Sequence, residues 1–566
     1  MHVIQHLPAT TITHDPAAAG ARGDNHWRAH LSVEVLLLLA SLLFTIGFNV
    51  AFWSAAIDEP LRQWRLAVSL FLLMTALHAC LLGLVATRST IKPLLWVLLP
   101  LTALVSHMMM AYGVFVDADM LRNVVHTDRA EASELFTAGL LPALLLGLLP
   151  LPVLSRIELS TRPRRRALVA RLLFLLAMAV VGIGGALLSA PEIASLMRNQ
   201  REVRYLVTPA NYVVSLASVL LSEPPGAHAA LLPVGTDARQ SPRAAGSKPR
   251  LLLVVVGETA RAANWGLDGY PRQTTPRLAQ VSGLVNFTRV SACGSSTEVS
   301  LPCMFSPHGR ADYDAKRIRH SQSVLHVMDH AGVPVLWRDN QSGCKSVCEG
   351  LDTERLQGSK DPAHCIDGHC HDGILLQGLD ARIAPGPGDR VVVLHQMGNH
   401  GPSYFERYPP AFRRFTPACE SADLGSCDRQ SIVNAYDNAL LYTDHVLAEA
   451  IIWLQGKGDY DTAMLYVSDH GESLGEKGLY LHGVPYPIAP SEQLHVPMVA
   501  WFSPGFEAST DLDQACVARR ASQPASHDNL FSSLLGLMDV QTGVYRAELD
   551  LFAGCRRAVR AAGDGT

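Results

Sequence analysis

Hydrophobic residues are spread very unevenly along this chain of 566 residues. Residues 31–190 are dominated by Leu, Ala and Val, whereas residues 250–566 alternate short apolar runs with polar segments. The first region holds about five stretches long enough to cross a bilayer, each of which takes roughly 20 residues. We expect these spans near 32–56, 66–87, 93–116, 135–155 and 168–190. The pattern predicts an α-helical membrane domain followed by a separate globular domain.

The second region has the pattern of an α/β domain. Apolar runs of strand length lie at 251–256, 333–337, 390–394 and 463–467, and a helical pattern covers about 430–455. Alternation of this kind predicts a mostly parallel sheet with helices on both faces.

The segments outside these two regions complete the organisation. Residues 191–222 mix apolar residues with Arg198, Arg201 and Arg204, which predicts an amphipathic segment along the membrane surface. Residues 223–249 are rich in Pro, Gly, Ala and Ser without periodicity, as in a linker. We therefore expect an N-terminal segment at 1–30, a transmembrane domain at 31–190, a bridge and linker at 191–249, and a globular domain at 250–566.

Basic residues set the orientation of the expected spans. Short cytoplasmic loops are rich in Lys and Arg, and the loop before the fifth span contains Arg156, Arg162, Arg164, Arg165, Arg166 and Arg171. With that loop inside, five spans place the N-terminal segment in the cytoplasm and the globular domain outside. Arg62 and Arg65 in the first external loop are a mild contradiction, which the denser cluster outweighs.

Cysteine usage tests this orientation independently. Ten of the eleven cysteines lie in the globular domain, and eight of them form closely spaced pairs. These pairs are Cys293/Cys303, Cys344/Cys348, Cys365/Cys370 and Cys419/Cys427, with Cys516/Cys555 as a candidate fifth. The alternative, a cysteine–zinc site, would favour repeated CxxC spacing, so disulfides in an oxidising compartment are the better interpretation. The sequence therefore predicts an inner-membrane protein with its large domain in the periplasm.

Candidate metal ligands follow three of the expected strands. Glu258 ends the first run, His395 and His400 follow the run at 390–394, and Asp469 and His470 follow the run at 463–467, with His482 further on. In open α/β sheets the ligand crevice lies outside the carboxyl ends of the strands. Carboxylate oxygen and imidazole nitrogen are ligands that suit zinc. The pattern predicts a metalloenzyme, and hydrogen-bonded polar residues at the sheet edge are the alternative.

A candidate nucleophile lies in the segment 291–306. Cys293 and Cys303 would close a tight turn around Ser295, Ser296 and Thr297, and a metal ion would activate one of these hydroxyls. The residues alone do not decide which hydroxyl acts, and a Ser/Thr cap before a helix accounts for the same segment. Thr259, beside Glu258, is a weaker rival.

Other polar groups have less specific interpretations. Asn123, Thr127 and Glu131 lie four residues apart, hence on one helix face, as in an ordinary solvated surface. His395 is as consistent with a core position as with a site, and a structural role is expected for His495. The remaining cluster, interpreted as exposed loop histidines, is His364, His369 and His371.

Six motifs in order resemble the lipid A phosphoethanolamine transferases, a family that includes transferable polymyxin-resistance enzymes. The motifs are GETAR (257–261), CGSSTEVSLPCMFS (293–306), WRDN (337–340), NHGP (399–402), SDHGESLGE (468–476) and YLHG (480–483). The resemblance covers essentially the whole chain. It implies an alkaline-phosphatase/sulfatase-like α/β fold for the periplasmic domain.

The resemblance also implies roles for individual residues. Thr297 would be the nucleophile, and Glu258, Asp469 and His470 would bind the first zinc with Thr297 as the fourth ligand. The residues for a second metal ion or the substrate phosphate would be His400, His482 and Lys345. The residues that hold the donor head group would be Asn123, Thr127 and Glu131.

The implied reaction transfers phosphoethanolamine from phosphatidylethanolamine to a phosphate of lipid A through a phosphoethanolamine–threonine intermediate. Such a modification lowers the negative surface charge and so weakens binding of cationic peptides such as polymyxins. The alternatives are another acceptor, either a core sugar of lipopolysaccharide or a periplasmic glycan, and a catalytically inactive lipid-binding or scaffold protein. We expect a monomer. The net charge of −4 and the absence of a basic stripe exclude a nucleic-acid partner.

Overall fold

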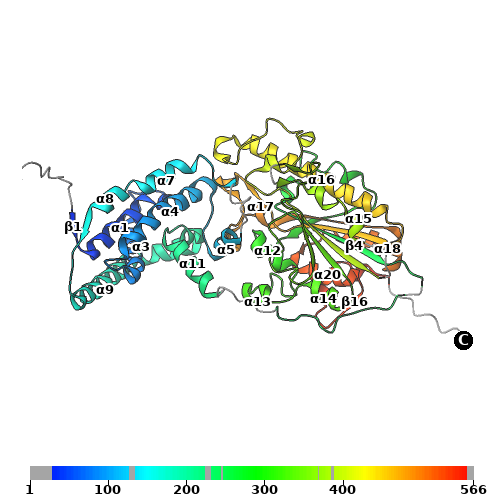
Figure 1. Ribbon diagram of the computed structural model, residues 1–566, viewed down its shortest axis with the longest axis horizontal. Coiled ribbons are helices and arrows are strands. Elements are labelled where there is room, and N and C mark those ends of the chain that lie inside the picture. Colours follow the sequence, from blue (N-terminus) through cyan, green and yellow to red (C-terminus); the bar gives the residue numbers. More distant parts are fainter. Residues whose placement is uncertain are drawn as a thin grey trace, which may run out of the picture.

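A helical half and a sheet-containing half lie side by side in this computed structural model (Figure 1). The structure describes residues 29–126, 134–222, 231–243, 246–366, 369–383 and 388–557. Helices α1 to α11 form the first half, and all strands from β3 onward belong to the second half. The arrangement agrees with the expected membrane domain followed by an α/β domain.

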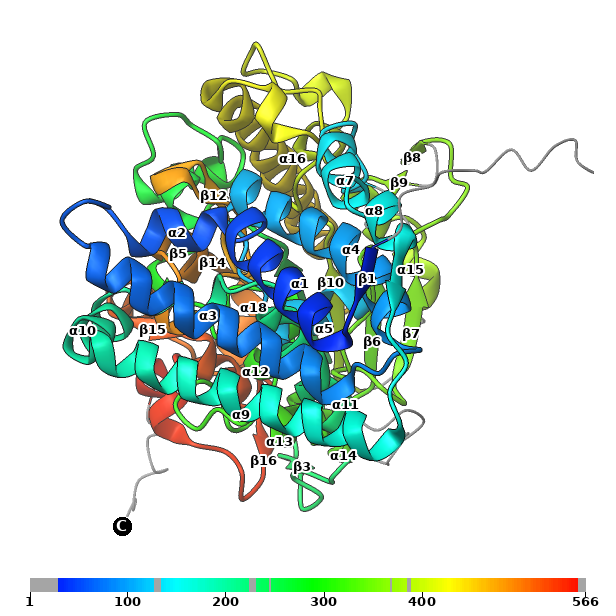
Figure 2. The same ribbon diagram turned by 90° about the vertical axis from the view of Figure 1, so that its left-hand side faces the viewer.

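The described part of the helical half contains three helices that are long and apolar enough to cross a membrane. These are α3 (Trp64–Val85), α4 (Ile91–Tyr112) and α9 (Arg164–Leu188). They match three of the five expected spans, and α9 packs along α3 in the view of Figure 2.

The first expected span is a bent pair of helices, α1 (Val33–Gly47) and α2 (Val50–Ala56), which meet at 59°. Asn49 sits at the bend, where its side-chain amide donates to the carbonyls of Phe44 (2.8 Å) and Thr208 (2.7 Å). A side chain that takes a helix carbonyl in this way interrupts the backbone ladder. Asn49 thus ties the bend to the segment that follows the membrane helices.

The fourth expected span is shorter than predicted. It consists of α7 (Leu140–Leu148) and α8 (Leu151–Arg156), which together fall below the length of the three long helices. Pro150 caps α8 and provides no N–H for a backbone hydrogen bond, so a break at this position is expected. The described residues thus hold three long helices, one bent pair and this shorter apolar pair at the positions of the five expected spans.

Short elements surround these spans. Strands β1 (Ala29–Leu31) and β2 (Ile157–Leu159) pair in parallel and join the start of α1 to the end of α8. The expected amphipathic bridge is broken into short helices: α10 (Ala190–Asn199), η1 (Arg201–Tyr205) and α11 (Ala210–Ser222). Helix α5 (Ala118–His126) leaves α4 and lies against the sheet-containing half.

An eight-stranded sheet organises the described part of the second half. In order across the sheet, its strands are β15 (Ala525–Ser526), β5 (Val285–Ser291), β14 (His495–Phe502), β11 (Asp461–Ser468), β4 (Arg250–Gly257), β10 (Arg390–His395), β6 (Val335–Asp339) and β7 (Asp352–Arg355). The run from β11 to β7 is parallel, whereas β14 is antiparallel to both neighbours. The sheet is mostly parallel, as the sequence predicts.

Two cores cover the two faces of this sheet. Strand β4 is buried throughout, with Leu252, Val254 and Val256 in one apolar cluster and the alternate residues in the other. The first face is covered by α12 (Thr297–Met304), α14 (Val324–His330), α18 (Pro504–Ser509), α19 (Gln514–Arg520) and α20 (Leu530–Leu537). The second is covered by α15 (Leu379–Arg382) and α16 (Arg429–Gln455). Continuous apolar runs are typical of strands buried on both faces.

Other short elements in this half are β3 (Arg239–Gln240), α13 (Ala315–Arg319), β8 (Cys365–Ile366), β9 (His369–Cys370), β12 (Ser473–Leu474), β13 (Tyr480–Leu481), α17 (Ser491–Leu494) and β16 (Val540–Gln541). Within the described residues, disulfides link Cys293–Cys303, Cys344–Cys348, Cys365–Cys370, Cys419–Cys427 and Cys516–Cys555. These are the pairings that the spacing predicts, including the candidate fifth.

Candidate active site

The candidate site lies at the carboxyl edge of the parallel strands. Glu258 follows β4 directly, and Asp469 and His470 follow β11, whose last residue pairs with Gly257. Strand β10 lies on the other side of β4, with His395 opposite Val256. Parallel neighbours end at one edge of a sheet, so these three strands deliver their polar residues to one place.

Glu258, Asp469 and His470 form one buried cluster. None of the three side chains is exposed, and one ligand atom from each lies within 4.8 Å of the other two. The Thr297 hydroxyl donates to the Glu258 carboxylate, at 3.0 and 3.1 Å from its two oxygens. The same Oγ1 lies 3.3 Å from His470 Nε2. The structure thus brings all four predicted residues together.

The position of Thr297 comes from the start of a helix. Ser296 is the N-cap of α12 and Thr297 is its first residue, so the positive end of the helix lies beside the hydroxyl. The Cys293–Cys303 disulfide ties the preceding turn to this helix. Ser295 instead donates to the Val484 carbonyl at 2.6 Å. Of the candidate hydroxyls, Thr297 is the one bonded to the acidic cluster.

The hydrogen bonds around the cluster leave metal-binding atoms facing inward. His470 Nδ1 lies 2.9 Å from the Gly471 carbonyl, which turns Nε2 toward the carboxylates of Glu258 and Asp469, 3.3 Å from an oxygen of each. Asp469 Oδ1 accepts from the Thr259 and His470 N–H groups, at 3.2 and 2.7 Å. Its Oδ2 is buried with no hydrogen-bond partner among the described residues. A buried carboxylate oxygen without a donor fits a cation, so these residues suit a metal ion.

The charges of the cluster are consistent with a divalent cation. Burial, together with the nearby Glu258 charge, raises the pKa of the Asp469 carboxyl. Although burial disfavours the imidazolium, the Asp469 and Glu258 carboxylates raise the pKa of His470 above its ordinary value. The buried carboxylates of Glu258 and Asp469 therefore need a nearby positive charge to offset their own. A metal ion would supply that charge without a proton.

His400 and His482 lie beside this cluster. The His482 ring centroid is 4.5 Å from that of His470 and 5.4 Å from that of His400. His482 Nδ1 bonds to a Glu472 oxygen at 2.8 Å, and Tyr404 donates to the other Glu472 oxygen at 2.5 Å. Burial lowers the pKa of His482, which favours the neutral ring that can bind metal or accept a proton. Glu472 orients His482, a role that the sequence analysis did not assign.

Gln341 is another residue of the site that the sequence analysis missed. It follows the WRDN segment at the end of β6, and its amide donates to Glu258 at 3.0 Å. Gln341 could have been found from the sequence, because it lies just beyond the carboxyl end of β6, a strand next to β10. Gly398 lets the chain pass close to Glu258, because a side chain at this position would put Cβ 2.6 Å from the Glu258 carbonyl oxygen.

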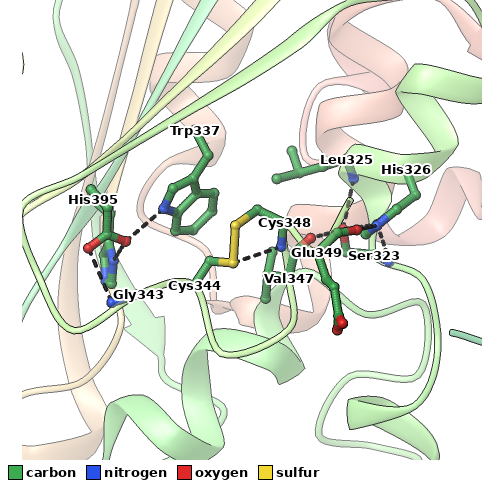
Figure 3. The surroundings of a disulfide bond; sticks show 11 residues. Ser323, Leu325, His326, Trp337, Gly343, Cys344, Val347, Cys348, Glu349 and His395 are labelled. Carbon is green, nitrogen blue, oxygen red and sulfur yellow. Dashed lines mark hydrogen bonds and ion pairs between the residues drawn. A yellow bond between two sulfur atoms is a disulfide. The ribbon is translucent and has the colours of Figure 1, made fainter. Parts of the chain in front are cut away.

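His395 and Lys345 lie further out. His395 Nδ1 bonds to Asp339 at 3.0 Å, and Figure 3 shows its ring near Trp337, which also donates to Asp339. The His395 ring is buried at the end of the sheet, so its position combines features of a core histidine and of a site residue. Lys345 lies in the turn closed by the Cys344–Cys348 disulfide, and its amino group donates to Ser342 at 3.0 Å. The expected phosphate contact of Lys345 remains a prediction.

The predicted head-group residues are only partly described. Asn123 lies on α5, whereas Thr127 and Glu131 lie outside the described residues. A cavity of about 180 Å³ lies between the start of α5 and the start of α12, and both Ser295 and Ser296 line it. Among the other histidines, His495 bonds to the Thr288 carbonyl at 3.0 Å, in keeping with a structural role.

Comparisons with known proteins agree with this geometry. The phosphoethanolamine transferase EptA/EptB family matches residues 74–223, and the sulfatase family matches residues 250–540. The phosphoethanolamine transferase EptA of Escherichia coli K12 is 38% identical over 548 residues, which cover 94% of this chain and 98% of that protein. The phosphatidylethanolamine transferase Mcr-1 of Escherichia coli is 36% identical, with 91% and 96% covered.

Solved structures give the same result. The lipooligosaccharide phosphoethanolamine transferase EptA of Neisseria meningitidis, an integral membrane protein, superposes with a TM-score of 0.88 at 36% identity. The match covers 94% of this chain and all of that one. Its separate soluble domain is 46% identical and matches 58% of this chain with a TM-score of 0.56. The chain belongs to the phosphoethanolamine transferase family, as an inner-membrane enzyme whose sulfatase-like catalytic domain lies in the periplasm.

Proposed function

We propose that this protein transfers phosphoethanolamine from phosphatidylethanolamine to a phosphate of lipid A. Thr297 is the nucleophile, and Glu258, Asp469 and His470 hold zinc with the Thr297 oxygen as fourth ligand. The observation that carries the proposal is the buried Thr297 hydroxyl, which bonds to Glu258 at 3.0 Å and lies 3.3 Å from His470 Nε2. A hydroxyl placed between a carboxylate and an imidazole is ready to lose its proton.

The first half-reaction loads Thr297. A zinc ion at this site would lower the pKa of the threonine hydroxyl and offset charge on the phosphate. Thr297 Oγ1 attacks the phosphorus of phosphatidylethanolamine, and the bond from phosphorus to the glycerol oxygen breaks. Diacylglycerol leaves with the proton, and phosphoethanolamine stays bonded to Thr297. The backbone N–H groups at the start of α12 stabilise the phosphate oxygens.

The second half-reaction releases the group. A protonated phosphate oxygen of lipid A attacks the same phosphorus, the bond to Thr297 Oγ1 breaks, and the proton of the attacking phosphate passes to Thr297 Oγ1. We assign His400, His482 and Lys345 to a second metal ion or to the transferring phosphate, and Asn123, Thr127 and Glu131 to the donor head group. Both substrates are lipids, which gives the membrane half a physical purpose. The protein acts as a monomer in this proposal.

Mass spectrometry of lipid A from expressing cells tests the proposal. We expect phosphoethanolamine on lipid A with the wild type and none with Thr297→Ala. Thr297→Ser keeps a hydroxyl and should retain part of the modification, and Ser295→Ala is the matched loss of a neighbouring hydroxyl that is bonded to backbone.

The outcomes separate the candidate functions. Modified lipid A with Thr297→Ala would exclude this nucleophile. Unmodified lipid A in every strain would exclude this acceptor, and a labelled group on the core sugar or on periplasmic glycan would identify the alternative. A protein that binds no zinc and carries no group on Thr297 would be the inactive scaffold.

A further inference from the structure

A buried ion pair joins the two halves of the molecule. Glu134 lies between α5 and α7, on the membrane side of the boundary, and Arg407 follows the short helix η6 (Tyr404–Glu406) of the catalytic domain. Arg407 Nη2 lies 2.7 and 2.5 Å from the two Glu134 oxygens. Only 3% of the Arg407 side chain and 7% of the Glu134 side chain are exposed. Water therefore screens this pair little.

The same guanidinium also reaches the active site. Arg407 Nε donates to the backbone carbonyl of His400 at 2.7 Å. The His400 ring meets His482 edge to face, and His482 in turn lies beside His470. Because a guanidinium is planar and its donors are fixed in direction, the contact with Glu134 determines where Nε points. A carboxylate from the membrane half is thus linked through one side chain to the backbone that carries His400.

We propose that Arg407 is a positioning residue that sets His400 for transfer only while Glu134 docks the catalytic domain on the membrane half. The proposal rests on the function proposed above, in which His400 acts at the transferring phosphate. Without Glu134, the buried guanidinium would lose the carboxylate that it bonds to and keep only the nearby Glu406 charge. That loss is unfavourable, so Arg407 turns to water and releases the His400 carbonyl. Transfer is thereby restricted to a catalytic domain seated at the membrane, where both lipids lie.

A metal site is the competing interpretation of this corner. One ligand atom each of Glu134, His369 and Glu406 lies within 4.8 Å of the others. Both Glu134 oxygens, however, already accept from Arg407. A divalent cation there would be repelled by the adjacent guanidinium. The contacts therefore favour an ion pair over a metal ion.

The test uses the full-length protein in liposomes that contain phosphatidylethanolamine. The rate of phosphoethanolamine loading on Thr297 is measured by mass spectrometry against donor concentration, for Glu134→Ala, Arg407→Ala and the double variant. We expect each single change to lower the maximal rate on the order of 10- to 100-fold, as for residues that orient a metal-site group. The donor concentration at half-maximal rate should change little. The double variant should lose no more than the worse single one, because both act through His400.

Matched variants exclude a general loss of structure. Glu420→Ala breaks the exposed ion pair with Arg413 in the same domain and should load at the full rate. Glu134→Asp keeps the carboxylate and should recover part of the rate. If Arg407→Ala does not fold, Arg407→Lys replaces it, since one ammonium cannot serve both partners and the rate should still fall. Amide hydrogen exchange across residues 399–407 should become faster in Glu134→Ala.

Three results would overturn the proposal: full loading in both single variants, losses that multiply in the double variant, or unchanged exchange at 399–407 in Glu134→Ala. A loss of bound metal and of activity in His369→Ala would show that Glu134, His369 and Glu406 form a metal site instead. A wild type that never loads Thr297 would refute the proposed function. The exchange measurement needs no activity and still tests the link to Glu134.

Discussion

At the scale of single residues, the most informative group is the Asp469 carboxylate, whose Oδ2 accepts no hydrogen bond among the described residues and lies 3.3 Å from His470 Nε2. Asp469→Asn keeps the size of the side chain but removes its charge, so we expect bound metal per protein to fall by more than about tenfold, since residues that merely orient a ligand have effects of that size. Elemental analysis of purified protein measures this. Asp444→Asn is the control, because Asp444 is also buried but accepts from the backbone of residues 277–278. Full metal content in Asp469→Asn would contradict the assignment.

His527 makes stability depend on pH. Its ring is buried, with Nδ1 accepting from the Cys293 N–H and Nε2 donating to the Ser468 carbonyl. Burial lowers the pKa of His527 from 6.5 to about 4. Between these pH values the unfolded chain binds a proton that the folded chain does not, so stability is lost as the pH falls. The loss between about pH 7 and pH 5 is about 2 kcal/mol.

Unfolding of the wild type and of His527→Gln at these two pH values measures that contribution. The variant is less stable at both, because it loses the ring contacts, but its pH-dependent part should be smaller by about 2 kcal/mol. Equal pH dependence in both proteins would mean that other groups dominate.

The core of the site could be predicted from residue types at strand ends. Glu258, Asp469 and His470 follow apolar runs directly, and neighbouring parallel strands bring such residues together. Glu472 and Gln341 could not be assigned in this way. Their roles depend on side chains far along the chain, such as Tyr404 for Glu472, which meet only after folding.

At the scale of elements, two disulfides of different loop length have different tasks. The Cys293–Cys303 disulfide joins residues 10 apart in sequence and closes a loop that contains Thr297. The Cys516–Cys555 disulfide joins residues 39 apart, and its loop lies away from the site. Loop-closure entropy predicts a loss of about 3 kcal/mol for the first and about 4 kcal/mol for the second when both cysteines become Ala.

The effect on activity should be larger for the loss of Cys293–Cys303 than for the loss of Cys516–Cys555, the opposite of the order for stability. The short loop holds Thr297, the proposed nucleophile, so removal of its disulfide should lower Thr297 loading at a temperature where both variants are folded. Removal of Cys516–Cys555 should leave loading close to the wild-type rate. Thermal unfolding and loading rates measured on the same samples check both orders. Equal activity of the two variants would show that α12 alone positions Thr297.

The elements differ in how well the sequence predicts them. Strands β4, β10 and β11 lie within two residues of the expected runs, because an apolar run of strand length between polar segments is too short for a buried helix. The fourth span was predicted too long, since hydropathy alone does not register the break at Pro150. The bend at Asn49 depends on Thr208, which is distant in sequence.

At the scale of the whole molecule, the soluble domain of the Neisseria relative has been solved separately, so we expect the catalytic domain of this chain to fold on its own and the helical half to bring it to its lipid substrates. A chain that begins at Leu231 should fold and bind metal. Its transfer from liposomal donor should fall by on the order of 10²–10⁴, because anchoring no longer raises the local concentration of lipid. Loading from a water-soluble donor analogue is the control. A truncated chain as active on liposomes as the full protein would exclude this role.

The active-site edge of the sheet faces the helical half: α5 packs beside α12, and the apolar cluster at the boundary includes Val484, close to His482. Thr297, the proposed nucleophile, is therefore held at a fixed distance from the helical half. In the proposed reaction, a phosphate on a long glycan would lie too far from the membrane to reach Thr297. A phosphate buried among the acyl chains would lie too deep. We therefore expect acceptors to be selected first by the distance of their phosphate from the membrane surface.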